Sequence, residues 1–300
     1  EASIKVDANN ITTNGVVDAV ATIDLDSASS TVINGTLNAM ANVDIDSTGN
    51  TEINGTVNSD TNLTINANTG LVTNAALSAG NELVITSDNG SVVLNDTVAA
   101  GDNLTIETIN GLLAEALLQS GLGLDITSDQ GGVTTNGLIR SSGQLVINTK
   151  GDIELNEDVI VTDLIDIETD SAIVLTAGHD VVVGNTADIT SASFTMNGDD
   201  QLTPEEQAKL DVEGAVHITT TGDTTLQIVD VNSSIKISAD NLVVDVKLNT
   251  DADALAMIDI DSAGSTIVNG SVNATGNVDI DSVASTEING TVNSDTNLTI

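Results

Sequence analysis

Aliphatic and polar residues alternate in short runs along the whole chain. Runs such as Val43-Asp44-Ile45-Asp46 have a period of two, which is typical of a β-strand with one buried face. Glycine and asparagine separate these runs, as in the stretches NGT, NANTG and SDNG, and such residues favour tight turns. An amphipathic helix would instead need a period near 3.6 residues. The pattern therefore predicts short strands joined by turns.

The runs recur with a period of about 20 residues. Asparagine marks the period at residues 14, 34, 54, 74, 95, 136 and 156, and Glu115 stands at the one skipped position. Aliphatic residues follow each marker after three, nine and eleven positions, as Val57, Leu63 and Ile65 follow residue 54. The run LLAEALLQ at 112–119 has helical propensity, but it is in phase with these core positions, so we expect strands there too. Each repeat should carry at least two strands.

A single 20-residue repeat buries too little apolar surface to be stable alone, so the repeats must stack on one another. Stacking places residue i over residue i+20 with turns about 4.8 Å apart. The predicted fold is all-β: a single-stranded parallel β-helix, or β-solenoid, with about 20 residues per turn. The asparagines would then form a structural ladder, in which stacked amides hydrogen-bond along the axis. The predicted ladder residues are Asn14, Asn34, Asn54, Asn74, Asn95, Asn136, Asn156, Asn249, Asn269 and Asn289. Glycan attachment at sequons such as Asn54-Gly55-Thr56 is the alternative for this residue type.

A longer repeat of about 235 residues is superimposed on the short one. Residues 31–65 and 266–300 are identical at 26 of 35 positions, and TEINGTVNSDTNLTI occurs without change at 51–65 and 286–300. We predict that residues 251–300 start a second copy of this unit. The unit would be roughly 55 Å long at the rise of a solenoid.

One segment, residues 192–223, departs from the short repeat. In DDQLTPEEQAKLDVEG, Thr203 is a candidate N-cap, Pro204 the first helical residue, and Glu206 completes a capping box. We predict solenoid turns over 1–191 and 224–300, with an insertion over 192–223 that holds a short helix near 203–212. The insertion either covers one side of the solenoid or docks onto a neighbouring copy.

Composition limits the classes of function. The chain is 40% hydrophobic and should fold, yet Phe194 is its only aromatic residue. A net charge of −39 disfavours nucleic acid and anionic membranes as partners. The chain has no cysteine, no apolar run long enough to span a membrane, and begins at Glu1. We expect a mature or excised segment, with any export signal outside it.

Parallel β-helices also carry polysaccharide lyases and hydrolases, so catalysis has to be considered. Such sites combine carboxylates with a basic residue and usually with aromatic platforms for sugar rings. Here His179 and His217 have no evident partner in the sequence, and the common hydrolase, protease and phosphate-binding motifs are missing. The other basic residues considered are scattered: Lys5, Lys150, Lys236, Lys247 and Arg140. We predict that the chain is not an enzyme and has no catalytic residues.

Carboxylates are the only candidates for a binding site. The aspartates of the IDLDS, VDIDS and IDIDS runs should point outward and stack, which places like charges one strand spacing apart. We favour a solvated acidic face without any ion or cofactor; calcium, which prefers several oxygen ligands, is the alternative and the one candidate cofactor. The candidate metal ligands are Asp24, Asp26, Asp44, Asp46, Asp259, Asp261, Asp279 and Asp281.

Units such as GNELVITSDNGSVVLNDTVAAGDNLTIETINGLL at 80–113 resemble the repeats of filamentous-haemagglutinin-type adhesins, which are secreted by the two-partner route. The resemblance covers nearly the whole chain except 192–223. It implies a right-handed β-helix, a location outside the cell or on its surface, and a role in adhesion or matrix building. The secretion domain of that family is not present in these residues.

These features lead to an expected function. We expect a structural protein: a fibre or filament whose copies associate end to end or side by side. A stalk that presents a receptor-binding or glycan-binding tip located elsewhere is the alternative, and a polysaccharide-acting enzyme comes third.

Overall fold

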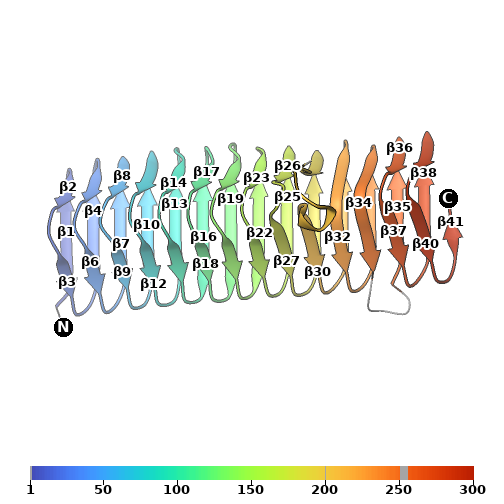
Figure 1. Cartoon of the computed structure of the whole chain (residues 1–300). Coiled ribbons are helices and arrows are strands. Elements are labelled where there is room, and N and C mark those ends of the chain that lie inside the picture. Colours follow the sequence, from blue (N-terminus) through green and yellow to red (C-terminus); the bar gives the residue numbers. More distant parts are fainter. Residues whose placement is uncertain (1, 200, 251–255) are drawn as a thin grey trace. The chain divides into compact units, whose positions relative to one another are not determined.

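The computed structural model describes residues 2–199, 201–250 and 256–300, and all regular elements in these ranges except one short 3-10 helix are β-strands (Figure 1). The chain divides into two compact units, Glu1–Gly151 and Asp152–Ile300. Each unit is a parallel β-solenoid, and the two contain about 14 turns of about 20 residues in all. The predicted fold class is confirmed.

Each turn of the first unit adds one strand to each of three columns, here named A, B and C. Column A consists of β1 (Ile4–Ala8), β4 (Ile23–Ser27), β7 (Val43–Ser47), β10 (Leu63–Ala67), β13 (Leu83–Ser87), β16 (Asn103–Thr108), β19 (Gly123–Ser128) and β22 (Gln144–Thr149). Column B consists of β2 (Ile11–Thr13), β5 (Thr31–Ile33), β8 (Asn50–Ile53), β11 (Gly70–Thr73), β14 (Val92–Leu94), β17 (Leu112–Ala114) and β20 (Val133–Thr135). Column C consists of β3 (Val17–Ala19), β6 (Leu37–Ala39), β9 (Val57–Ser59), β12 (Leu77–Ala79), β15 (Val98–Ala100), β18 (Leu118–Ser120) and β21 (Ile139–Ser141).

The second unit has the same three columns, but two long strands, β32 (Thr224–Val231) and β34 (Leu242–Thr250), run through both B and C. Its column A consists of β25 (Ile165–Thr169), β28 (Ala187–Ser191), β31 (Val216–Thr220), β33 (Ile235–Ala239), β35 (Ile258–Ser262), β38 (Val278–Ser282) and β41 (Leu298–Thr299). The other strands of column B are β23 (Ile153–Leu155), β26 (Ala172–Leu175), β29 (Ser193–Met196), β36 (Ser265–Val268) and β39 (Ser285–Ile288). Those of column C are β24 (Val159–Val161), β27 (Asp180–Val183), β30 (Lys209–Val212), β37 (Ser271–Ala274) and β40 (Thr291–Ser294).

Parallel pairing fixes the register between successive turns. Leu63 of β10 lies between Val43 of β7 and Leu83 of β13, so each position pairs with its equivalents in the preceding and the following turn. The main chain carries this pairing, as when the Leu63 amide donates to the Glu82 carbonyl at 2.9 Å. Equivalent residues of successive turns therefore lie directly over one another.

The core is the set of inward-pointing side chains of all three columns. In β7, Val43, Ile45 and Ser47 are buried, whereas Asp44 and Asp46 are partly exposed. The LLAEALLQ run forms β17 and β18, with Ala114 and Leu118 buried as predicted. Helical propensity is overridden there because only a strand can pair with both neighbouring turns.

The predicted insertion and its helix are largely wrong. The only helix in the described residues is a single 3-10 turn, η1 (Pro204–Glu206), and no helix there is long and apolar enough to cross a membrane. The Glu206 carboxylate does accept the Thr203 amide at 3.0 Å, as the capping motif predicted. However, Leu210 and Val212 of β30 are buried and pair with β27, which a helix over 203–212 would prevent.

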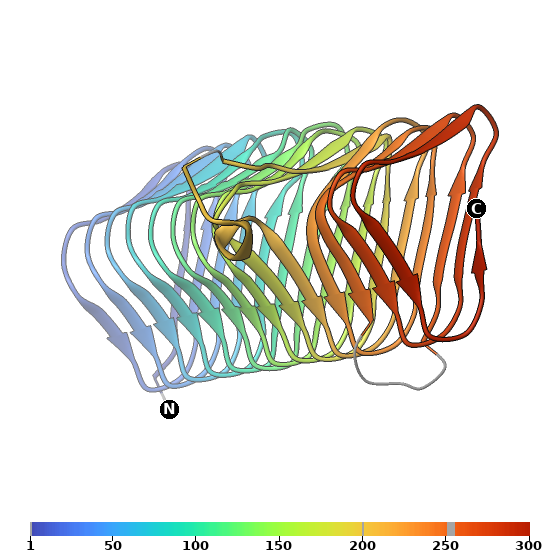
Figure 2. The same cartoon turned by 45° about the vertical axis from the view of Figure 1, so that its right-hand side comes forward.

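The excursion from the solenoid is accordingly shorter than residues 192–223. Strand β29 pairs with β26, and β30 pairs with β27, so the phase is kept up to Met196 and resumes at Lys209. Of the described residues in 192–223, those between these two strands lie outside the stacked strands. In Figure 2 the η1 turn lies on the outside of the neighbouring strands.

The second copy of the long repeat begins earlier than predicted. Its expected start, 251–255, lies outside the described residues, but β33 already corresponds to β1. Residues 3–11, SIKVDANNI, match residues 234–242, SIKISADNL, in sequence. Both strands also pair with the next IDLDS-type strand in the same register. The connection that follows Thr250 is longer than its counterpart in the first copy. A search for residues 235 positions apart therefore finds the turns after this connection and misses the turn before it.

Glycines at the turns are required by the close approach of adjacent turns. A Cβ on Gly121 would overlap the carbonyl oxygen of Gly101, one turn earlier. We expect Gly121→Ala to lower the free energy of unfolding by about 1–3 kcal/mol, because a backbone atom cannot move aside. Unfolding in urea, followed by circular dichroism, measures this change.

Gly123→Ala is the matched control for this prediction. A Cβ on Gly123, two residues further on, would meet only side-chain atoms, the nearest being Asn103 Oδ1 at 3.1 Å. We expect its unfolding free energy to stay within about 0.5 kcal/mol of wild type. Equal stabilities of the two variants would contradict the role assigned to the turn glycine.

Candidate functional site

An asparagine ladder runs along the outside of the first unit. Each Nδ2 donates to the Oδ1 of the asparagine one turn earlier. The donor–acceptor distances are 2.9 Å from Asn34 to Asn14, 3.0 Å from Asn54 to Asn34, and 2.8 Å from Asn74 to Asn54 and from Asn95 to Asn74. Every amide in this run donates in the same direction, so the ladder is a directed chain of side-chain hydrogen bonds.

The remaining predicted ladder residues differ in their partners. Asn136 donates to Glu115 Oε2 at 3.1 Å, so the carboxylate replaces one asparagine in the first unit. In the second unit Asn156 accepts the Thr176 hydroxyl, and Asn289 donates to Asn269 at 3.1 Å. All of these contacts join neighbouring turns.

Asn249 does not belong to this ladder, contrary to the prediction. Asn269 donates instead to Asp245 Oδ1 at 2.9 Å, while Asn249 pairs in register with Asn273 and is buried. The reason is the lengthened connection after β34, which increases the separation in the sequence between Asn269 and its ladder partner.

A second asparagine ladder was not predicted from the sequence. Asn58 donates to Asn38 at 2.9 Å, and Asn38 donates to Asp18 at 2.8 Å. In the second unit Asn293 donates to Asn273 at 2.8 Å. The sequence does contain a signal for this second ladder, since another asparagine stands four positions after each of Asn34, Asn54, Asn269 and Asn289.

The candidate metal ligands do stack as predicted. In the first unit Asp24 pairs with Asp44, and Asp26 with Asp46. In the second unit Asp259 pairs with Asp279, and Asp261 with Asp281. In each unit the four aspartates therefore form two adjacent stacks of carboxylates on the outer face of column A.

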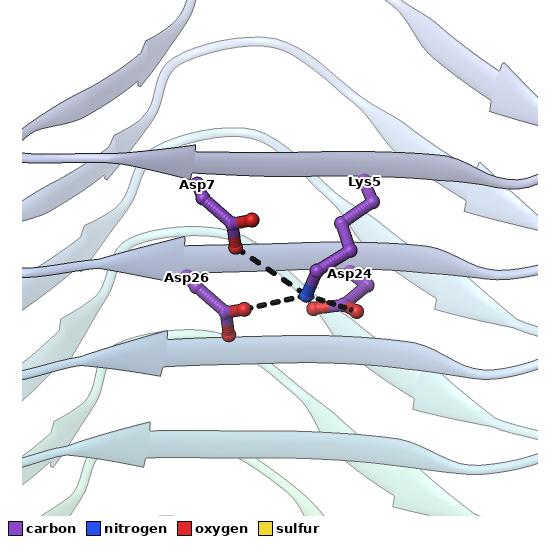
Figure 3. A network of polar contacts seen from close by, with 4 residues as sticks. All are labelled: Lys5, Asp7, Asp24 and Asp26. Atoms are coloured by element: carbon purple, nitrogen blue, oxygen red, sulfur yellow. Dashed lines mark hydrogen bonds and ion pairs between the residues drawn. The ribbon is translucent and has the colours of Figure 1, made fainter.

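In the first unit a lysine, Lys5, lies next to Asp24 and Asp26 of the following turn (Figure 3). Lys5 Nζ is 2.7 Å from Asp24 Oδ2, 2.6 Å from Asp26 Oδ2 and 3.4 Å from Asp7 Oδ1. Hydrogen bonds to these carboxylates raise the pKa of Lys5, and the bond from Lys5 lowers the pKa of Asp26. The ammonium group thus stabilises charges that would otherwise repel each other.

The same cluster occurs in the second unit. Lys236 Nζ is 2.7 Å from Asp259 Oδ2 and 3.3 Å from Asp261 Oδ2, and these bonds raise the pKa of the lysine. In the sequence the two lysines look scattered, because the separation between each lysine and its aspartates differs between the two copies. The match between residues 3–11 and 234–242 aligns the two lysines, and the strand register shows that both lie over the aspartates of the next turn.

Aspartates one turn further on lack this lysine contact. Oδ1 of Asp44 and Oδ1 of Asp279 are buried and have no hydrogen-bond partner. Burial, and then the charges of Asp46, Asp24 and Asp26, raise the pKa of Asp44. Among the described residues no group of three or more histidine, cysteine or carboxylate side chains is arranged to hold a metal ion. Calcium binding by these aspartates stays a prediction.

The two histidines have acidic neighbours that the sequence did not reveal. His217 Nδ1 is 2.6 Å from Oδ1 of Asp188, the residue paired with it one turn earlier. His179 Nδ1 is 3.5 Å from Asp158 Oδ1 and 3.6 Å from Glu157 Oε2. Both contacts join successive turns, like those of the ladders.

The direction of the ladder can be tested with Asn54→Asp. An aspartate cannot donate to Asn34 Oδ1, nor to Glu52 Oε1, which Asn54 Nδ2 also reaches at 2.9 Å. We expect a loss of about 1 kcal/mol in unfolding free energy at pH 7. Asn14→Asp is the control, because Asn14 accepts from Asn34 and donates to no described residue. A loss in both variants of the same size would contradict a directed ladder.

Asp44 should make stability depend on pH. Since its folded pKa is raised above the usual 3.8, the unfavourable contribution is absent below pH 3.8 and develops as pH rises through the folded pKa. We expect Asp44→Asn to stabilise the protein by about 0.5 kcal/mol at pH 7 and to have no effect near pH 3. Chemical unfolding at both pH values measures this.

Asp60→Asn is the control for Asp44→Asn, because it removes one negative charge from an exposed position. We expect it to change stability much less at pH 7. The same experiment tests calcium. If the wild-type protein has the same melting temperature with calcium as with a chelator, these aspartates do not bind the ion in a way that stabilises the fold.

Comparison with known proteins returns no relative for this chain. No protein-family model matches it, and no curated protein and no solved structure is significantly similar to it.

Proposed function

We propose that the chain is part of an extracellular structural protein, a repetitive β-solenoid fibre or cell-surface filament without catalytic activity. The observation that carries this proposal is the reuse of one set of turns in residues 3–65 and 234–300, down to the lysine over paired aspartates. Each turn of a solenoid contacts mainly its neighbours, so adding copies lengthens it without changing the turns already present.

The outer face supports a mechanical role. Its asparagines bond to one another from turn to turn, so the side chains add a second set of axial links to those of the main chain. Short, hydrogen-bonded side chains lose little conformational entropy when the turns stack. Ladders of this kind would stiffen a fibre along its axis.

The location and partners belong to the proposal as well. The resemblance to two-partner-secreted adhesins favours the cell surface or the extracellular space. We propose association between copies, end to end or side by side, and no nucleic acid or membrane partner, since the net charge of −39 repels polyanions. A stalk that carries a receptor-binding tip elsewhere in a longer chain is the second candidate.

Electron microscopy and fibre diffraction of the native material test the proposal. We expect long filaments of uniform width and, from aligned filaments, a meridional reflection near 4.8 Å from strands perpendicular to the axis. Dispersed rods that each end in a knob would contradict the fibre and favour the stalk. If the 4.8 Å reflection is missing, or lies on the equator, both the fibre and the stalk are contradicted.

A further inference from the structure

A cleft of about 580 Å³ opens on the outer face of the second unit, where the chain departs from the repeat. One wall is the excursion between β29 and β30 that contains η1, and the other is formed by β32 and β34. Residues that matter for its chemistry are Asn197, Asp199, Leu202, Gln207, Gln227 and Asp245. Repetition does not explain this site, because no other described turn carries such an excursion.

Gln227 is the unusual residue of the cleft. It stands at the irregularity in β32, where the register with β34 shifts between Leu226 and Ile228, and it is only 6% exposed. Its Nε2 donates weakly to Asp245 Oδ2 at 3.4 Å, and no described residue donates a hydrogen bond to its Oε1. This amide oxygen receives no donor from the described residues, and Gln227 lines the cleft, so a ligand there can reach it. A ligand that donates hydrogen bonds would supply one.

The charge of the cleft selects the kind of donor. Asp199 and Asp245 contribute two carboxylates, and no lysine, arginine or histidine is among the described lining residues. Each carboxylate has one oxygen in a short hydrogen bond, since Asp199 Oδ1 accepts the Gln201 amide at 2.8 Å and Asp245 Oδ1 accepts from Asn269 at 2.9 Å. The described lining therefore carries two negative charges and no positive one, which favours a cation over an anion.

The wall opposite Gln227 is held in place by its own hydrogen bonds. Gln207, 8% exposed, donates to the carbonyls of Asp199 and Leu202 at 2.8 and 3.3 Å, and accepts the Asp199 amide at 2.7 Å. Leu202, Pro204 and Val246 add apolar surface to the lining. The cleft thus combines ordered acceptors with apolar side chains, which suits a charged group on an aliphatic stem.

We propose that this cleft binds a primary ammonium group carried on an aliphatic chain. The ammonium would donate to Gln227 Oε1 and to the carboxylates of Asp245 and Asp199, while the methylenes pack against Leu202 and Pro204. The ligand is either a free aliphatic diamine or a lysine side chain of another protein, because both present the same chemistry. This inference does not depend on the proposed role as a fibre.

Calorimetric titration of the whole chain with cadaverine and, separately, with Nα-acetyl-lysine methylamide tests the proposal at about 0.15 M salt, which screens non-specific attraction. We expect one saturable site per chain. Asp245→Asn and Gln227→Leu, which keep the side-chain volume nearly constant, should each weaken binding about tenfold or more. Tight binding of cadaverine alone would identify a free diamine as the ligand, and binding of the lysine derivative a protein side chain.

Asp125→Asn is the control, because it removes one negative charge from an exposed position of β19, far from the cleft in sequence. It should leave the affinity unchanged, and circular dichroism should show that all three variants are folded. Non-saturable binding, or equal binding by wild type and Asp245→Asn, would overturn the proposal, since the acidic surface alone would then account for it. Stoichiometric calcium binding that displaces cadaverine would also overturn it in favour of a metal site.

Discussion

Parallel pairing between equivalent residues of successive turns is the constraint on which the rest of the structure depends. It places these residues one strand spacing apart, as Leu63 lies between Val43 and Leu83. Any side chain must then tolerate, or bond to, its counterpart above and below. Aliphatic residues satisfy this condition inside and asparagines satisfy it outside. Glycine is needed where a Cβ would strike the preceding turn, as at Gly121.

Charge is the property that such stacking tolerates least. The chain carries 45 acidic residues and only 6 basic ones, so most stacked carboxylates cannot have a basic partner. Two of the six lysines and arginines lie over paired aspartates at equivalent places in the two copies of the repeat. Elsewhere an asparagine follows the carboxylate, as Asn66 donates to Asp46 at 2.6 Å. The stack of Asp26 and Asp46 therefore ends in a donor, whereas Asp44, which stacks on Asp24, keeps an oxygen without a hydrogen-bond partner.

Repetition and specific chemistry occur in different parts of this molecule. Ladder residues use their hydrogen-bonding capacity on neighbouring turns, which suits a fibre. Non-repetitive groups collect where the pairing is interrupted, at the excursion before β30 and at the irregularity of β32. Gln227 lines the cleft there, and no described residue donates a hydrogen bond to its Oε1. A repetitive chain can in this way hold a cleft without disturbing its stacked turns.

The sequence by itself determined the strands, the short period, the parallel solenoid and most of the first ladder, because these follow from a local pattern that repeats. Tertiary structure decided what depends on register. It made residues 209–212 a strand, since Leu210 and Val212 pair with β27. It put Asp245 in the ladder in place of Asn249, and it brought Lys5 and Lys236 over their aspartates at unequal spacings. The physical reason is that connections of variable length change the spacing in the sequence, while main-chain hydrogen bonds keep the turns aligned in space.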